Sequence, residues 1–218
     1  MSILNVWRTP ERVRVCVDTE AYDLITGLRF QMAKVYAFPH ANMLIAGRGI
    51  GQFTAAFAAG IEQIASLDFD KMLDGFKEML EAAHAGVPAY VRAALESMGC
   101  EMLLAGWSQR EGRLLAHVFQ RSAGVGGVFV PRNVEQGVQP WLLAPHADLG
   151  WNFGVPESDE DLLITARYQV TWHRRNAPGA PIGGSLVLAE LTRDAVTVRT
   201  IGDLGTTPEL PDGEKWAP

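Results

Sequence analysis

The chain has few cysteines, no long apolar run and no excess of basic residues. Its two cysteines, Cys16 and Cys100, lie far apart, so they offer neither a disulfide framework nor a paired metal motif, and both are expected in the core. No segment reaches the roughly 18 to 20 consecutive apolar residues that cross a bilayer, and the N-terminus lacks a secretory pattern. We therefore expect a cytoplasmic protein with no membrane partner.

The charge balance is acidic, with a net charge of -6. Proteins that bind nucleic acid concentrate Lys and Arg, so nucleic acid is not an expected partner. The histidines show no ligand spacing, and we expect neither a metal nor a cofactor. They are His40, His84, His117, His146 and His173.

The composition is that of one globular domain. The 218 residues are 48% hydrophobic and 20% charged, which is enough apolar content for one good core. No repeat or linker interrupts the chain. We expect one domain over residues 1–205, followed by a polar, proline-containing tail over residues 206–218.

Alternating and apolar runs predict four strands before any helix, over residues 3–8, 12–18, 34–38 and 43–46. In the second run Val13, Val15 and Val17 alternate with Arg12, Arg14 and Cys16, which is typical of a strand with one buried face. Helical stripes follow over residues 52–66 and 70–85, and the second restarts after Pro88 toward residue 98.

The second half returns to strands. Residues 101–107 and 113–119 predict a hairpin, and short strands are expected at 128–130 and 141–143. Ser158 and Asp161 form a capping box that opens a helix to about residue 174, and residues 185–191 and 195–201 predict a closing hairpin. This order excludes a doubly wound parallel sheet. It favours an α+β, four-layer αββα sandwich of two antiparallel sheets flanked by helices.

Ser2, Asp18 and Lys34 are spaced sixteen residues apart, at the ends of predicted strands. With their neighbours they resemble the proteasome β-subunit family and its simpler bacterial relatives, which are N-terminal-nucleophile hydrolases. The matching segments are residues 2–6, 13–18, 34–36 and 44–47, and residues 182–189 resemble that family's last hairpin. After Asp18 the resemblance departs at Thr19-Glu20-Ala21-Tyr22, on the substrate-facing edge.

The resemblance implies a peptidase or amidohydrolase with Ser2 as nucleophile once Met1 is removed. The α-amino group of Ser2 would be the base, Lys34 would lower its pKa, Asp18 would hold Lys34, and the Gly47 N–H would face the oxyanion. The resemblance also implies a peptide or amide substrate and a homo-oligomeric ring, and leaves open an unfoldase partner.

Three alternatives stay open. The chain can be a catalytically inactive protein of the same fold with a structural, assembly or binding role, and Asp18 and Lys34 can be an ordinary ion pair. It can also be a small-molecule binder that uses the glycine-rich region 122–156.

Two other motifs have structural explanations that we favour. The glycines at 47, 49 and 51 lack the full dinucleotide-binding pattern and better suit a helix start packed close to a sheet. The aromatic clusters 151–153 and 172–175 better suit a core edge and a solvated helix end than a binding surface.

Overall fold

The computed structural model describes residues 2–23, 25–64, 68–134, 137–140, 156–176 and 182–205. Within these residues the fold is α+β and every strand pairing is antiparallel, which confirms the expected class at that level. The described strands form two five-stranded sheets and one two-stranded hairpin.

The first sheet contains the N-terminal hairpin and the closing hairpin. Its order is β10-β1-β2-β11-β12. The strands are β10 (Gly137–Pro140), β1 (Leu4–Arg8), β2 (Arg12–Asp18), β11 (Ser185–Thr192) and β12 (Val196–Asp203). The last hairpin therefore pairs beside the first one, through β2 and β11.

The second sheet has the order β5-β6-β7-β8-β9. Its strands are β5 (Val35–Phe38), β6 (Met43–Arg48), β7 (Cys100–Ser108), β8 (Arg113–Arg121) and β9 (Phe129–Asn133), and the 3-10 turn η1 (Pro39–Ala41) joins the first two. A separate hairpin of β3 (Glu20–Tyr22) and β4 (Arg29–Gln31) precedes this sheet. Six strands thus come before the first helix, and not the expected four.

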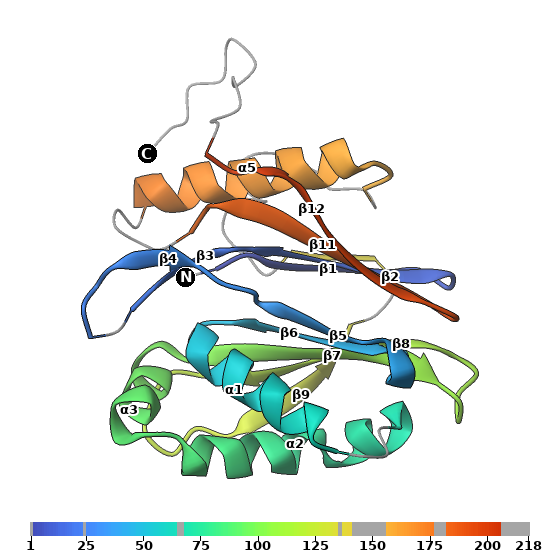
Figure 1. The fold of residues 1–218 in the computed structure, drawn as a ribbon, viewed down its shortest axis with the longest axis horizontal. Helices are drawn as coiled ribbons and strands as arrows, with labels where there is room; N and C mark the ends of the chain where they lie inside the picture. The colour runs from blue at the N-terminus through green and yellow to red at the C-terminus, as the bar shows by residue number, and fades with distance from the viewer. Residues whose placement is uncertain are drawn as a thin grey trace.

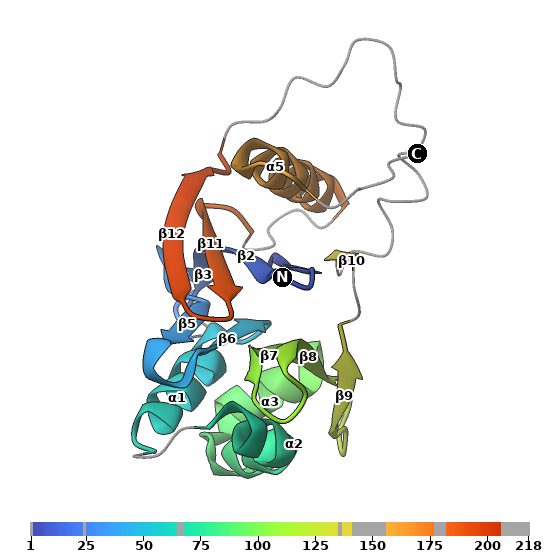
Figure 2. The same ribbon diagram turned by 90° about the vertical axis from the view of Figure 1, so that its right-hand side faces the viewer.

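Helices lie beyond both sheets (Figures 1 and 2). Helix α5 (Asp159–Asn176) lies along the first sheet, whereas α1 (Gly51–Glu62), α2 (Phe69–Gly86) and α3 (Ala89–Met98) lie along the second. Asp68 caps α2 by accepting the Lys71 N–H at 3.1 Å. The predicted capping box of α5 is confirmed, because Ser158 Oγ accepts the Asp161 N–H at 3.1 Å and the Asp161 carboxylate accepts the Ser158 N–H at 2.9 Å.

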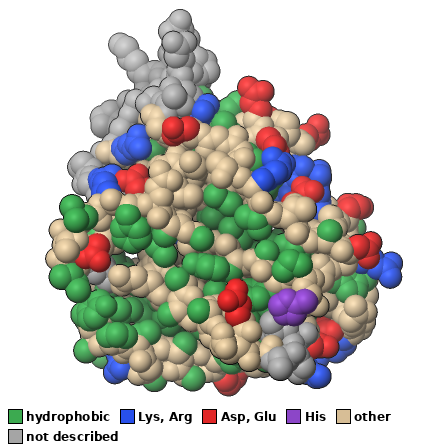
Figure 3. Space-filling view, viewed as in Figure 1, with side chains coloured by type: hydrophobic (Ala, Val, Ile, Leu, Met, Phe, Trp, Pro, Cys, Tyr) green, Lys and Arg blue, Asp and Glu red, His purple; other side chains and the backbone are tan. Residues whose placement is uncertain are grey.

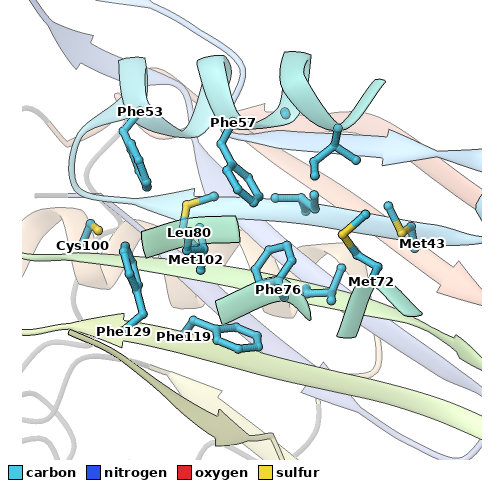
Figure 4. Close-up of a cluster of buried hydrophobic side chains, with 14 of the residues drawn as sticks. Met43, Phe53, Phe57, Met72, Phe76, Leu80, Cys100, Met102, Phe119 and Phe129 are labelled. Atoms are coloured by element: carbon cyan, nitrogen blue, oxygen red, sulfur yellow. The ribbon is translucent and has the colours of Figure 1, made fainter. Parts of the chain in front are cut away.

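Three hydrophobic clusters hold these elements together. One joins α5 to the first sheet through residues such as Leu162, Val170 and Ile3. A second joins the facing sides of the two sheets, with Val15 and Leu103 among its members. The third joins α1, α2 and α3 to the second sheet and is rich in phenylalanine and methionine (Figure 4).

Strand β2 is buried on both faces, which corrects the expectation of a single buried face. Val13, Val15 and Val17 pack between the sheets, and Cys16 lies under α5 with none of its surface exposed. Arg14 is 8% exposed, and its guanidinium bonds Glu190 at 2.8 Å and the Pro156 carbonyl at 3.0 Å. The alternation of residue types is real, but a helix covers the second face.

Most other boundaries agree with the sequence to within a few residues. Both cysteines are free and buried, as expected. The expected strand at 141–143 and the tail at 206–218 lie outside the described residues. Among the described residues, no helix is long and apolar enough to cross a membrane.

Candidate functional site

Three strand ends bring Ser2, Asp18 and Lys34 together. Ser2 lies two residues before the start of β1, Asp18 ends β2, and Lys34 directly precedes β5 of the other sheet. All three are buried, with 5%, 0% and 3% of their surface exposed. The even spacing seen in the sequence therefore corresponds to one cluster at the edge between the two sheets.

Lys34 is the centre of this cluster. Its Nζ lies 2.9 Å from Ser2 Oγ, 3.0 Å from Asp18 Oδ1 and 2.5 Å from the Glu20 carbonyl oxygen. The predicted pairing of Asp18 with Lys34 is thus confirmed. Burial lowers the pKa of Lys34, and the neighbouring Asp18 carboxylate opposes that change. The ammonium group is held where its charge acts directly on Ser2.

Asp18 also fixes the backbone around the cluster. Its Oδ1 accepts the Ile3 N–H at 2.8 Å, and its Oδ2 accepts the Gly183 N–H at 3.2 Å. One carboxylate therefore holds the start of β1, the turn before β11 and the Lys34 side chain. Such a network sets the position of Ser2 more tightly than a single ion pair.

Gly47 lies close to the cluster, but its N–H belongs to the sheet. That N–H donates to the Lys34 carbonyl at 2.9 Å and continues the pairing of β5 with β6. A Cβ at Gly47 would lie 2.1 Å from Thr54 Oγ1 of α1, so glycine allows the helix to pack on the strand. The structural explanation favoured for this glycine is confirmed, and the N–H is not free to face an oxyanion in this structure.

The other glycines of this run serve the same close packing. Gly49 has a φ of +112°, and a Cβ there would lie 2.9 Å from the Gly99 carbonyl oxygen. A Cβ at Gly51 would lie 2.4 Å from the Met32 sulfur. Strand β6, which precedes them, pairs antiparallel with both neighbours, unlike a dinucleotide-binding unit.

A cavity of about 480 Å³ opens beside Ser2 and Lys34. The β3–β4 hairpin forms one wall, through Tyr22 and Phe30, and the α3–β7 junction forms the opposite wall from Met98 onward. Figure 3 shows the surface hollowed on the left, where these two parts approach each other in Figure 1. The cavity is large enough for a side chain and its flanking backbone.

Polar side chains of adjacent strands line the cavity next to the cluster. Arg48 of β6, Glu101 of β7 and Gln120 of β8 are register partners in turn. Arg48 Nε lies 3.0 Å from Glu101 Oε2, and burial raises the pKa of Glu101. Sequence reasoning missed these residues, because nothing in the spacing of 48, 101 and 120 reveals that they are neighbours across strands.

No metal centre is found in the part of the chain that the structure describes, where no group of three or more His, Cys, Asp or Glu side chains could hold an ion. Of the two aromatic clusters, 151–153 lies outside the described residues. In the other, His173 is buried and Arg174 is exposed, as expected of a core edge followed by a helix end.

Comparison with known proteins shows a likeness of fold. No protein-family model matches the chain, and no curated protein matches it. A solved structure of a mutant of Anbu from Hyphomicrobium sp. strain MC1 is similar, with a TM-score of 0.56 and 10% identity over 93% of this chain and 88% of that one. Anbu has a proteasome-related fold.

These comparisons correct the family assignment. The motifs of residues 2–47 suggested membership in the proteasome β-subunit family, but no family model matches the chain, and 10% identity supports a shared fold alone. Short motifs at strand ends reflect the demands of a fold and a site, and so do not by themselves define a family. The chain has a proteasome-related α+β fold with a buried serine, lysine and aspartate cluster beside a cavity.

Proposed function

We propose that this protein is an N-terminal serine hydrolase of peptide or amide bonds, with Ser2 as the nucleophile after removal of Met1. The observation that carries the proposal is the 2.9 Å contact between Lys34 Nζ and Ser2 Oγ, held by Asp18. A serine hydroxyl needs activation, and this cluster provides a fixed positive charge beside it at the edge of a cavity.

The base in this proposal is the α-amino group of Ser2. Its ordinary pKa is about 7.7 to 8.0, and the nearby Lys34 ammonium lowers it by like-charge repulsion. The neutral amine then accepts the Oγ proton as Oγ attacks the substrate carbonyl carbon. It returns that proton to the leaving amine when the C–N bond breaks, and water hydrolyses the acyl–Ser2 ester by the same path.

The oxyanion donor in this mechanism is the Gly49 N–H, because the sheet occupies that of Gly47. N–H groups on a strand alternate between its two edges, so after Gly47 the next N–H on the β5 side of β6 is that of Gly49. Lys34 lies just before β5, and its carbonyl oxygen accepts the N–H of Gly47 on this edge of β6. Gly49, two residues further on, lines the cavity together with Ser2. A donor aimed at the developing charge is a large contribution in acyl transfer.

We further propose the four-layer αββα sandwich over one domain, residues 1–205, and a homo-oligomeric ring. The three hydrophobic clusters, one for each contact between successive layers, support the sandwich. Native mass spectrometry of the purified chain tests the ring, and a monomer at micromolar concentration would contradict it.

The decisive experiment is labelling of Ser2. A chain that begins at Ser2 is treated with an electrophilic trap for serine and threonine nucleophiles, and peptide mass spectrometry locates the adduct. We expect one adduct at Ser2 and none in Ser2→Ala. Ser122 also lines the cavity, so Ser122→Ala is the matched control and should label as the unmodified chain does. Labelling that persists in Ser2→Ala would show that the site is elsewhere.

The alternative is a catalytically inactive protein of this fold with an assembly or binding role. The observation in its favour is the Gly47 N–H, which is bonded within the sheet. Intact mass of the natively expressed chain separates the two functions. Retained Met1 leaves the Ser2 nitrogen as an amide, which cannot act as a base, and supports the inactive protein.

A further inference from the structure

His173 is a buried histidine without a hydrogen-bond partner. It is 1% exposed, and neither Nδ1 nor Nε2 has a partner among the residues that the structure describes. Its ring lies edge-to-face with Trp172, at 5.0 Å between centroids. A buried polar group is nearly always paired in a native protein, so an imidazole with two unused nitrogens calls for an explanation.

The packing of α5 on β1 places His173 over the beginning of the chain. The helix runs antiparallel to the strand. The carbonyl oxygen of Pro156, just before α5, accepts a hydrogen bond from the Arg14 guanidinium. Arg14 is the register partner of Trp7, which lies near the end of β1. Further along, Gln169 and Asn5 exchange two hydrogen bonds of 2.8 Å between their amides.

One helical turn beyond Gln169 is His173, and two residues before Asn5 on the same face of β1 is Ile3. Continued by one helical turn and two strand residues, this alignment points His173 toward the start of β1, on the face that carries Ile3. The positive N-terminus of the chain is accordingly among the charges that act on His173. Lys34 contacts Ser2 through the Ser2 side chain, so the alignment points the imidazole and the ammonium at Ser2 from different elements.

Burial, together with nearby positive charges, keeps His173 neutral. Burial, the Arg48 guanidinium and the positive N-terminus of the chain together lower its pKa to about 4. The further charged residues around Ser2 are Lys34, Asp18 and Glu20. At neutral pH the imidazole thus keeps a lone pair free to accept a hydrogen bond, next to an amine that has N–H groups to donate.

We propose that His173 is a positioning residue for the α-amino group of Ser2. Once Met1 is removed, one imidazole nitrogen accepts an N–H of that amine and directs the amine's own lone pair toward Ser2 Oγ. This inference rests on the proposed function, because it needs the free amine. His173 touches neither substrate nor Oγ, and it takes no proton in the reaction.

The proposal predicts how the pKa of the Ser2 amine changes when His173 is replaced. A neutral acceptor stabilises the protonated amine through a hydrogen bond to a charged group, and therefore opposes the lowering by Lys34. Loss of the acceptor should lower the pKa of the amine by about one unit, from the usual worth of such a bond. A residue that only filled space would leave that pKa unchanged.

The test measures the pKa of the Ser2 amine from the pH dependence of its reductive methylation, followed by mass spectrometry of the lysine-free N-terminal peptide that ends at Arg8, in chains that begin at Ser2. We expect a pKa about one unit lower in His173→Phe than in the unmodified chain, and close to that of the unmodified chain in His173→Gln, which keeps an acceptor. The matched control is His117→Phe, whose charged neighbours Glu111, Arg8 and Arg113 are not part of the Ser2 cluster. An unchanged amine pKa in a folded His173→Phe chain overturns the proposal.

Two further measurements keep the test decisive. If His173→Phe does not fold, ¹⁵N spectra of the unmodified protein replace it. A His173 ring resonance that shifts when Met1 is removed supports the hydrogen bond, and one that does not shift excludes it. The amine pKa is also measured in Ser2→Ala chains beginning at residue 2, where no nucleophile is present. Failure to label Ser2 then contradicts the proposed function without deciding the role of His173.

Discussion

The two helical sides of the molecule are packed in different ways. On the side of α1, α2 and α3, the contact with the second sheet is a large apolar cluster that includes Phe53, Phe57, Phe76 and Phe119 (Figure 4). On the side of α5, the contact with the first sheet is a smaller apolar cluster. Buried polar groups occur on both sides, but those under α5 include a side-chain amide pair, Asn5 with Gln169, in which both residues are buried.

The difference shows two ways of placing a helix on a sheet. An apolar contact is strong but tolerates small shifts, whereas paired buried polar groups fix one register because every other register leaves them unsatisfied. The polar contact lies behind β1, the strand that follows Ser2. We infer that the α1–α3 side supplies most of the stability and that the α5 side sets the position of the N-terminus.

The largest expected effect on the free energy of unfolding comes from a substitution on the α1–α3 side. Phe76 is fully buried among Phe57, Phe119 and their neighbours, so Phe76→Ala should lower the free energy of unfolding by about 3–5 kcal/mol. The matched change under α5, Val170→Ala, removes less volume and should cost about 2 kcal/mol. Denaturant unfolding measures both, and equal costs would break the comparison.

The second expected effect is a loss of folding stability at acidic pH. His173 has a pKa of about 4 in the folded chain and near 6.5 when unfolded, so below pH 6.5 the unfolded state binds a proton that the folded state does not. Stability contributed by the neutral imidazole is complete above pH 6.5 and falls as the pH drops to 4, by about 3 kcal/mol in total. Unfolding curves from pH 7 to pH 4 should be steeper in pH for the unmodified chain than for His173→Phe. Parallel curves would contradict this.

The third effect tests the amide pair. Gln169→Leu leaves the Asn5 amide buried without partners and should cost about 1–3 kcal/mol. The double variant Asn5→Leu with Gln169→Leu removes both polar groups and should recover much of the loss. Urea unfolding of the three variants checks this, and a double variant as unstable as the sum of its parts would mean that the pair is not a unit.

The smallest effect is at the surface of the apolar side. Arg110 and Asp74 form an ion pair at 2.9 Å, but their side chains are 52% and 60% exposed. Arg110→Ala should therefore leave the free energy of unfolding almost unchanged, because solvent screens an exposed ion pair. A thermal melt measures this change, and a larger loss would show that charge on this side matters more than its apolar packing.

Much of the fold was predictable, because long segments with a regular pattern of apolar residues indicate helices and strands. The apolar stripe of residues 70–85 and the hairpin around Gln109 to Gly112 were both found. The β3–β4 hairpin was missed, since its strands have three residues each and little burial. Its turn depends on Asp23, whose carboxylate accepts the N–H groups of Ile25 and Thr26, and one aspartate is a weak signal.

The site was predictable in part. Ser2, Asp18 and Lys34 lie at the ends of strands that the sequence reveals, so their meeting could be foreseen. Arg48 and Glu101 meet through the register of β6 with β7, which pattern alone does not give. The role of Gly47 depends on the Thr54 contact, and such close packing appears only in three dimensions.

The carboxylate of Asp18 has a consequence for synthesis of the chain. It bonds Ile3 at the beginning and Gly183 near the end, and β2 completes its pairing only when β11 is present. The Gly183 bond and the pairing of β2 with β11 therefore form only after β11 has been synthesised. Until then Asp18 lacks one of the contacts that fix its position beside Lys34.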